Sequence, residues 1–226
     1  MSKKKKGSVV TKEEKERNKE KEKVVQGKSQ VREWVESIAI ALILALFVRT
    51  FVVQAFKIPS GSMEPTLLIG DHLLVNKFLY GTKIPFTGIK VMPIREPERG
   101  DVVVFVYPVD PSKDFIKRAI GLPGDKVEVR NKKVYVNDIA IPDPHAHFAD
   151  DTIIPLGSDP RDNFGPVTVP PDSLFVMGDN RDRSYDSRFW GFVRNNEIKG
   201  RAFILYWSWD SNRFLPRLLR IGNLIY

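Results

Sequence analysis

The order of apolar and polar residues divides the chain into three parts. Residues 1–30 are rich in lysine and low in complexity, and an apolar run at 38–48 follows them closely. Beyond Gly70, short runs of Val, Ile, Leu and Phe alternate with Gly, Pro and Asp. This pattern predicts a disordered basic tail at 1–30, a transmembrane helix at 31–50 and a β-rich domain at 56–226.

The predicted helix is long enough to cross a bilayer. Residues 31–48 give 18 mostly apolar positions, and a membrane span needs roughly 17–25 residues. Charged residues near its start can reach the interface, and Trp34 suits the headgroup level. Two alternatives are a buried core helix and a cleaved signal peptide, although the long basic leader disfavours the second. We therefore expect one retained span with the N-terminus in the cytoplasm.

The region after the predicted helix is typical of antiparallel β-sheets. A Pro-, Asp- and Gly-rich stretch at 142–171 predicts a surface excursion. The segment 213–221 mixes Phe and Leu with Arg, a pattern that fits a terminal packing element or an element on a membrane surface. The fold class we expect is mainly β, an all-β domain after a single helix. Its candidate strands are short and bounded by turn residues: 71–76, 101–107, 126–136, 173–177 and 201–207.

Composition and charge exclude several classes of protein. With 226 residues, 42% of them hydrophobic, the chain can form a core, and the absence of cysteine excludes disulfides and a thiol nucleophile. Twelve Lys or Arg and six Glu give residues 1–33 a charge of +6, out of +8 for the whole chain. The remainder is nearly neutral, and no aromatic residue precedes Trp34, so we expect no nucleic-acid binding.

A proline-bracketed turn directly after the predicted helix holds a Ser-Gly-Ser sequence at 60–62. Its glycine lets the backbone come close to a reacting group, but a serine hydroxyl also needs a base within hydrogen-bond reach. His72 is one candidate base, although nothing nearby in the sequence orients it. His145 and His147 lie in the excursion without an evident third ligand, so we expect no metal site.

Lysine is the second kind of base that a serine can use. Its free pKa of about 10.4 leaves it protonated at neutral pH, so burial has to lower that pKa before lysine can accept a proton. Lys117 lies in an apolar stretch between Phe115 and Leu122, which suits such burial. Most lysines on strands point to solvent, however, so the residues alone leave His72 and Lys117 open as the base.

Three motifs occur in the order found in one enzyme family. They are Ser-Met-x-Pro-Thr from Ser62, Lys-Arg-x-x-Gly-x-Pro-Gly-Asp from Lys117, and Gly-Asp-Asn-Arg-Asp-x-Ser-x-Asp-Ser-Arg from Gly178. With them, most of the chain from residue 31 resembles the type I signal peptidases (leader peptidases), membrane-bound serine proteases that remove secretory signal peptides. The resemblance implies that Ser62 is the nucleophile, that Lys117 is the general base and that no cofactor is needed. It also makes 56–226 the catalytic peptidase domain.

The resemblance assigns roles to further residues. Ser60 matches the hydroxyl donor of an oxyanion hole, Ser184 the serine that orients the lysine, and Asp186 and Arg188 the charged pair that holds their loop. Four apolar residues match the lining of pockets that accept small side chains, usually Ala, one and three places before the cut: Ile58, Met63, Leu67 and Ile116. For the other charged residues of the third motif, a solvated turn and a direct role both remain open: Asp179, Arg181, Asp182 and Arg183.

The resemblance further implies partners and a location. The partners would be preprotein signal peptides with Ala-x-Ala-like cleavage sites, a lipid bilayer and the secretion translocon, with no nucleic acid. The enzyme would lie in the inner or plasma membrane with its catalytic domain on the outer face. Two rival interpretations are a LexA-type self-cleaving protein with a Ser/Lys dyad and a catalytically silent, membrane-tethered β domain that binds partners.

Overall fold

The computed structural model describes residues 12–81 and 93–226 of the chain. These residues belong to two compact units, one that ends at Val48 and one that runs from Arg49 to Tyr226. The first eleven residues of the tail predicted at 1–30 lie outside the described residues.

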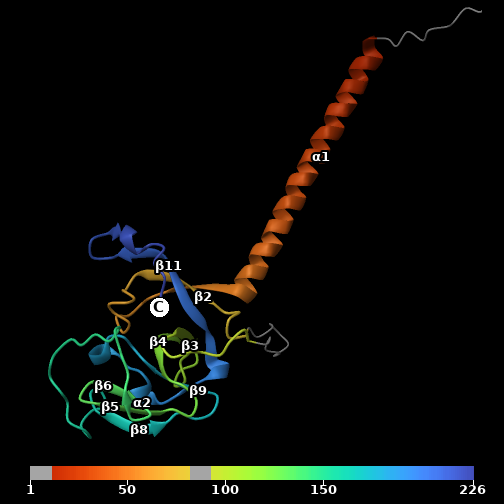
Figure 1. Ribbon diagram of the computed structural model, residues 1–226. Coiled ribbons are helices and arrows are strands. Elements are labelled where there is room, and N and C mark those ends of the chain that lie inside the picture. The colour runs from red at the N-terminus through yellow and green to blue at the C-terminus, as the bar shows by residue number, and fades with distance from the viewer. Residues whose placement is uncertain (1–11, 82–92) are drawn as a thin grey trace, which may run out of the picture. The chain divides into compact units, whose positions relative to one another are not determined.

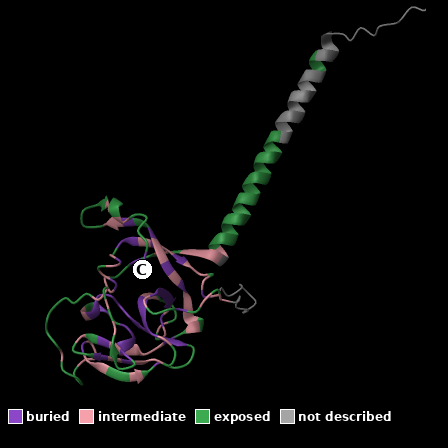
Figure 2. Cartoon of the chain, in the orientation of Figure 1, coloured by how far each residue is buried: buried purple, intermediate pink, exposed green. Residues whose placement is uncertain are grey.

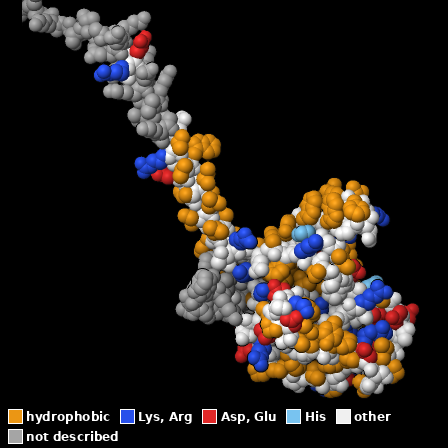
Figure 3. Space-filling view, turned by 180° about the vertical axis from the view of Figure 1, so that it is seen from behind, with side chains coloured by type: hydrophobic (Ala, Val, Ile, Leu, Met, Phe, Trp, Pro, Cys, Tyr) orange, Lys and Arg blue, Asp and Glu red, His pale blue; other side chains and the backbone are white. Residues whose placement is uncertain are grey.

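The first unit contains one long helix. Helix α1 (Lys12–Phe47) has 36 residues and begins inside the segment for which the sequence predicts disorder. Lys and Glu, which dominate its first half, are good helix formers, and this propensity accounts for the early start. From residue 30 to 47 the side chains are exposed, and the apolar ones give the orange stretch of helix in Figure 3. Among the helices described, none is both long and apolar enough to cross a membrane, so the span at 31–50 stays a prediction.

The second unit is built on two antiparallel sheets (Figure 1). The larger sheet has the order β1-β2-β11-β3-β4-β9-β10, with β12 paired to β11. The smaller sheet has the order β7-β6-β5-β8. The strands are β1 (Val53–Lys57), β2 (Asp71–Asn76), β3 (Val102–Val106), β4 (Asp114–Gly121), β5 (Lys126–Arg130), β6 (Lys133–Val136), β7 (Ile139–Ala140), β8 (Phe164–Thr168), β9 (Ser173–Met177), β10 (Val193–Arg194), β11 (Ile198–Asp210) and β12 (Leu215–Pro216).

Short helical elements connect these strands. A π-helical turn, η1, follows α1 in the chain, and one short α-helix, α2, lies between β9 and β10. Three 3-10 helices complete the described elements. The bounds are η1 (Val48–Val52), η2 (Arg181–Arg183), α2 (Ser187–Trp190), η3 (Asn195–Glu197) and η4 (Leu218–Arg220).

All five predicted strand regions are found, and the mainly β, antiparallel fold class is confirmed. The predicted strand at 126–136 is a hairpin of β5 and β6, because Asn131 and Lys132 adopt φ values of 48° and 68° and reverse the chain. Sequence patterns missed β4 because Lys117 and its neighbour Arg118 interrupt the apolar run. β8 lies inside the predicted excursion, and its Gly and Pro conceal a strand pattern.

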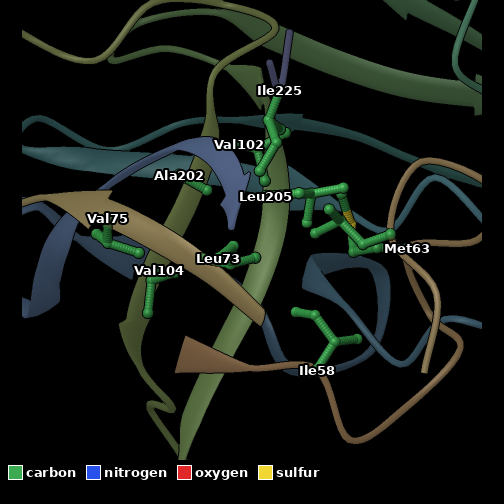
Figure 4. Close-up of a cluster of buried hydrophobic side chains, with 10 residues drawn as sticks. Ile58, Met63, Leu73, Val75, Val102, Val104, Ala202, Leu205 and Ile225 are labelled. Carbon is green, nitrogen blue, oxygen red and sulfur yellow. The ribbon is translucent and has the colours of Figure 1, made fainter. Parts of the chain in front are cut away.

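The core lies along the inner faces of the sheets, where Figure 2 shows the buried segments in purple. Ile58 and Met63, which flank the Ser-Gly-Ser turn, point into one cluster of this core (Figure 4). Each fully buried side chain of this size contributes about 1.5–3 kcal/mol. The turn is therefore anchored to the sheet on both sides. The cluster consists of Ile58, Met63, Leu67, Leu73, Val75, Val102, Val104, Ala202, Leu205 and Ile225.

Candidate active site

The Ser-Gly-Ser turn is a compact loop between β1 and β2. Within it, the Glu64 N–H donates to the Gly61 carbonyl at 3.1 Å, and the Leu67 N–H donates to the Met63 carbonyl at 2.9 Å. Met63 and Leu67 are fully buried and hold the loop on the core. Gly61 lies so close to the Glu64 carboxyl that an added Cβ would approach its carbon within 2.9 Å. These constraints fix the backbone on either side of Ser62.

Lys117 lies next to Ser62, although 55 positions separate the two residues in the sequence. It lies on β4, paired with Val103 of β3, and its Nζ is 2.6 Å from Ser62 Oγ. The same nitrogen donates to the Ile116 carbonyl at 3.1 Å and lies 5.4 Å from the centre of the Phe115 ring. Only 4% of Lys117 is exposed. The structure therefore brings together the two residues that the sequence suggests as nucleophile and base.

Burial prepares Lys117 for proton transfer. Loss of solvent around the ammonium is the main cause that lowers the pKa of Lys117 from 10.5 to about 8, and the nearby Arg188 charge adds to it. The carboxylates of Asp186 and Asp179 act in the opposite direction and limit the fall. A lysine with a pKa near the working pH holds a usable fraction in the neutral form, which is what a general base requires. The site can therefore deprotonate a serine hydroxyl.

A buried carboxylate ties the Ser-Gly-Ser turn to β4, the strand of Lys117. Asp179 accepts two hydrogen bonds from Arg118, at 2.7 and 2.6 Å, and one from Thr66 Oγ1 at 2.6 Å. It is fully buried, and the neighbouring Arg181 is only 2% exposed. For both residues a solvated turn is therefore wrong. Arg118 follows Lys117 directly and Thr66 follows Ser62 by four positions, so Asp179 joins the two halves of the site.

The remaining charged residues of the third motif differ from one another. The Asp182 side chain is 2% exposed, pairs with Lys132 Nζ at 3.0 Å and accepts from the Ala149 N–H, so a solvated turn is wrong for it too. Arg183 is exposed and lies at the rim of the cleft beside Ser62. The excursion at 142–171 binds this loop from outside, because the His147 N–H donates to the Asp179 carbonyl at 2.7 Å.

Asp186 and Arg188 form a buried ion pair that shapes the same loop. Arg188 Nε donates to Asp186 Oδ1 at 2.9 Å, and the Gly178 N–H donates to Asp186 Oδ2 at 3.0 Å. Burial by itself raises the pKa of Asp186, but the charge and hydrogen bonds of Arg188 outweigh it and keep that pKa below its ordinary value. The carboxylate therefore stays ionised close to Lys117 and helps set its pKa.

Ser184 lies behind the site without the contact that the resemblance implies. It is 5% exposed, and within the described chain no hydrogen bond joins its Oγ to Lys117; its hydroxyl instead helps to keep the pKa of Asp186 low. Gly178 lies against it so closely that an added Cβ would overlap both Ser184 Oγ and the Ser62 carbonyl oxygen. Only a glycine at 178 allows the two loops to meet.

A cleft of about 580 Å³ opens in front of Ser62 and Lys117. Ser60 is exposed at its wall, and Ile116 is among the residues that line it. Ile58, Met63 and Leu67 do not line it, because these side chains are buried in the core beneath the turn. The lining residues are Pro59, Ser60, Gly61, Ser62, Glu64, Ile69, Asp114, Phe115, Ile116, Lys117, Asn180, Arg183 and Tyr185.

The other candidate base is placed elsewhere. His72 pairs with Lys57 of β1, its ring lies against Tyr206, and it is not among the residues that line the cleft. Sequence reasoning gave no role to Thr66, Arg118 or Asn180, although each lies inside one of the three motifs. Asn180 binds the nucleophile turn directly, through Nδ2 to the Gly61 carbonyl at 3.1 Å and through its N–H to the Ser62 carbonyl at 3.2 Å.

Comparison with known proteins places this site in a family. Residues 31–207 match the sequence profile of the family described as signal peptidase, peptidase S26. The chain belongs to this family. A signal peptidase I from Pseudomonas aeruginosa is 38% identical over 84% of this chain and 78% of its own. A probable signal peptidase I-2 from Synechocystis is 42% identical over 77% and 73% of the two chains.

A solved signal peptidase I structure from Enterococcus faecalis V583 is also similar, with 32% identity and a TM-score of 0.40 over 48% of this chain and 97% of that one. The resemblance to signal peptidases drawn from the three motifs is confirmed by the family match. Membership makes this protein a serine endopeptidase, and its relatives support the cleavage of signal peptides.

Proposed function

We propose that this signal peptidase family member cleaves N-terminal signal peptides from preproteins with a Ser62/Lys117 dyad. The observation that supports this most is the 2.6 Å distance between Ser62 Oγ and a lysine nitrogen that is almost fully buried. A serine needs its base at hydrogen-bond distance, and a lysine needs burial to act as one.

The reaction would follow from these positions. Neutral Lys117 accepts the Ser62 proton as Oγ attacks the carbonyl carbon of the last signal-peptide residue. The tetrahedral oxyanion accepts hydrogen bonds from Ser60 Oγ and the Ser62 N–H, and such donors typically contribute about 2.7–4 kcal/mol each to the transition state. Lys117 returns the proton to the leaving amine. Water, deprotonated by Lys117 in turn, then hydrolyses the acyl-enzyme and releases Ser62.

The substrate would bind as an extended strand in the cleft. β9 pairs with β4 only from Arg118 onward, so the stretch from Asp114 to Ile116 has β3 on one side and the cleft on the other. A preprotein segment can therefore add to this edge by backbone hydrogen bonds. Ile116, Phe115 and Tyr185 narrow the cleft with large side chains, which favours small residues such as Ala next to the scissile bond.

Supporting roles fall to the loop behind the dyad. Asp186 and Arg188 hold its shape, and through it the position of Ser184 beside Gly178. Ser184, which packs against Gly178 in this loop, would orient Lys117. Ile58, Met63 and Leu67 would act from below, by fixing the floor of the turn.

We also propose that the chain is anchored in a bilayer by the apolar part of helix α1. Residues 38–47 of this helix are apolar and exposed, as the sequence requires of a lipid-facing segment. The basic residues before it favour a cytoplasmic N-terminus, which puts the peptidase unit on the outer face of an inner or plasma membrane, next to the translocon. Enzyme and signal peptide would then share one plane, which raises their effective concentration.

Cleavage of a labelled preprotein by the full-length protein in detergent micelles tests the dyad. Wild type should cut after an Ala-x-Ala-like site, and Ser62→Ala and Lys117→Ala should lose the activity by several orders of magnitude while still folding. The exposed neighbours Ser112→Ala and Lys113→Ala are matched controls and should retain it. Near-wild-type cleavage by Lys117→Ala would overturn the proposed base and point to His72.

A further inference from the structure

Residues 218–226 lie beyond the stretch that matches the family profile, which ends at residue 207. Three of these residues contact the structure around Ser62 and Lys117: Arg220, Ile225 and Tyr226. Two of these contacts reach the turn that holds Ser62, and one reaches the strand that holds Lys117. After β11, its last long strand, the chain therefore contacts both the turn of Ser62 and the strand of Lys117.

Arg220 fastens the nucleophile turn from behind. Its NH2 donates to the Thr66 carbonyl at 2.8 Å and to Asp71 Oδ2 at 2.6 Å, and its Nε donates to Asp71 Oδ1 at 3.3 Å. Asp71 is fully buried at the point where the turn joins β2, so the guanidinium bridges the end of the turn and the start of the strand. A planar fork of this kind fixes position as well as charge.

Ile225 supports the same turn through packing. It is 4% exposed and lies in the core cluster with Met63 and Leu67, the two residues that anchor the turn (Figure 4). Its N–H donates to the Phe203 carbonyl of β11 at 3.0 Å, which holds the segment on the larger sheet. Ile225 therefore forms part of the core on which the Ser62 turn rests.

Tyr226 reaches the lysine side of the dyad. Its main-chain oxygen accepts a hydrogen bond from Arg118 NH1 at 2.6 Å. Arg118 follows Lys117 on β4 and holds Asp179, which in turn holds Thr66. The contacts therefore form a closed circuit. Thr66 binds Arg220, and residues 220–226 connect Arg220 to Tyr226. Tyr226 binds Arg118, which binds Asp179, and Asp179 binds Thr66.

We propose that residues 218–226 are a positioning clamp that sets the separation of Ser62 and Lys117, with Arg220 as its main positioning residue. This inference rests on the proposed dyad. Serine and base have to lie at hydrogen-bond distance, and a misplacement of about 1 Å can reduce a rate about 100-fold. Arg220 touches neither substrate nor reacting atoms, so its loss should reduce kcat and leave KM unchanged.

Two substitutions at one position separate positioning from stability. Arg220→Lys keeps a positive charge for Asp71 but cannot bridge Asp71 and the Thr66 carbonyl in the same plane, whereas Arg220→Gln loses the charge as well. In the full-length protein in micelles, we expect Arg220→Lys to unfold in urea near the wild-type midpoint. Its kcat should fall about 10- to 100-fold with KM within about twofold of wild type. Arg220→Gln should lose both stability and kcat.

Arg161→Lys is the matched control. Arg161 makes a similar pair of bonds elsewhere, with Nη2 donating to the Thr152 carbonyl at 2.9 Å and to Asp162 Oδ2 at 2.7 Å, and it also bonds Asp150. It should keep the wild-type kcat. The clamp is overturned if folded Arg220→Lys cleaves at the wild-type rate, or if Arg161→Lys loses kcat to the same extent. Failure of the dyad itself would look different, because Ser62→Ala would then still cleave.

Discussion

Replacement of Lys117 by methionine removes the proposed base and a buried charge at once, and the two losses have opposite consequences. Activity should disappear, whereas the fold should become more stable at neutral pH. The pKa of Lys117 is lowered by burial to about 8, against an ordinary value of 10.5 in the unfolded chain. Below pH 8 the folded protein therefore holds a protonated ammonium in a place that disfavours it.

The size of the effect follows from the shift in pKa. Each pKa unit is worth about 1.4 kcal/mol, so a fall from 10.5 to about 8 corresponds to a penalty of about 3 kcal/mol in the folded state. The variant escapes this penalty but loses the hydrogen bond to Ser62, worth about 1 kcal/mol. At pH 7 we expect Lys117→Met to be more stable than wild type by about 2 kcal/mol.

The sign of the pH dependence is the sharper test. Between pH 8 and 10.5 the unfolded wild type binds more protons than the folded one, so wild-type stability rises with pH relative to the variant. The difference of about 2 kcal/mol at pH 7 should therefore reverse to about 1 kcal/mol in favour of wild type above pH 10.5, where only the hydrogen bond remains.

Urea unfolding of the full-length proteins in micelles, followed by tryptophan fluorescence from pH 7 to 10.5, measures this difference. The exposed Lys133→Met on β6 is the matched control for the loss of a lysine. A difference between wild type and Lys117→Met that stays constant over this range would refute the reasoning. Lys117 would then carry no lowered pKa, and the case for it as a base would lose its physical ground.

Two further outcomes are expected. The kcat/KM for preprotein cleavage should rise with pH and level off above about pH 8, since only neutral Lys117 accepts a proton; a rise centred near the ordinary histidine pKa of about 6.5 would instead implicate a histidine. Gly178→Ala should reduce both cleavage and stability, by about 1–3 kcal/mol in unfolding free energy, because its Cβ would overlap Ser184 Oγ and the Ser62 carbonyl. A fully active and stable Gly178→Ala protein would show that the two loops do not need to meet this closely.

Sequence patterns predicted the architecture well where local preferences govern it. The β class, the bounds of β2 and the strand regions follow from short apolar runs between turn residues. The motifs identified Ser62 and Lys117, although their meeting depends on the pairing of β4 with β3, which no local pattern encodes. Residues far apart in sequence become neighbours only through the sheet.

One group of misses has its physical cause in the burial of polar groups. Asp179 and Arg181 belong to a run of charges that would ordinarily be solvated, and only their ion pairs with Arg118 and Asp143 make burial possible. Conversely, Met63 and Leu67 follow the serine closely and suggest a pocket, yet they face the core because the turn needs an anchor. The direction of a side chain in an irregular turn is set by tertiary packing, which periodicity does not report.

The hydrogen bond from Arg220 to the Thr66 carbonyl joins residues 154 positions apart. A ribosome that adds about 5–20 residues per second makes Arg220 about 8–30 s after Thr66. Until Arg220 is made, the nascent chain carries Ser62 without the hydrogen bonds from Arg220 to the Thr66 carbonyl and Asp71. If Arg220 positions Ser62 as proposed, the arrangement of Ser62 and Lys117 is complete only after nearly the whole chain has been made.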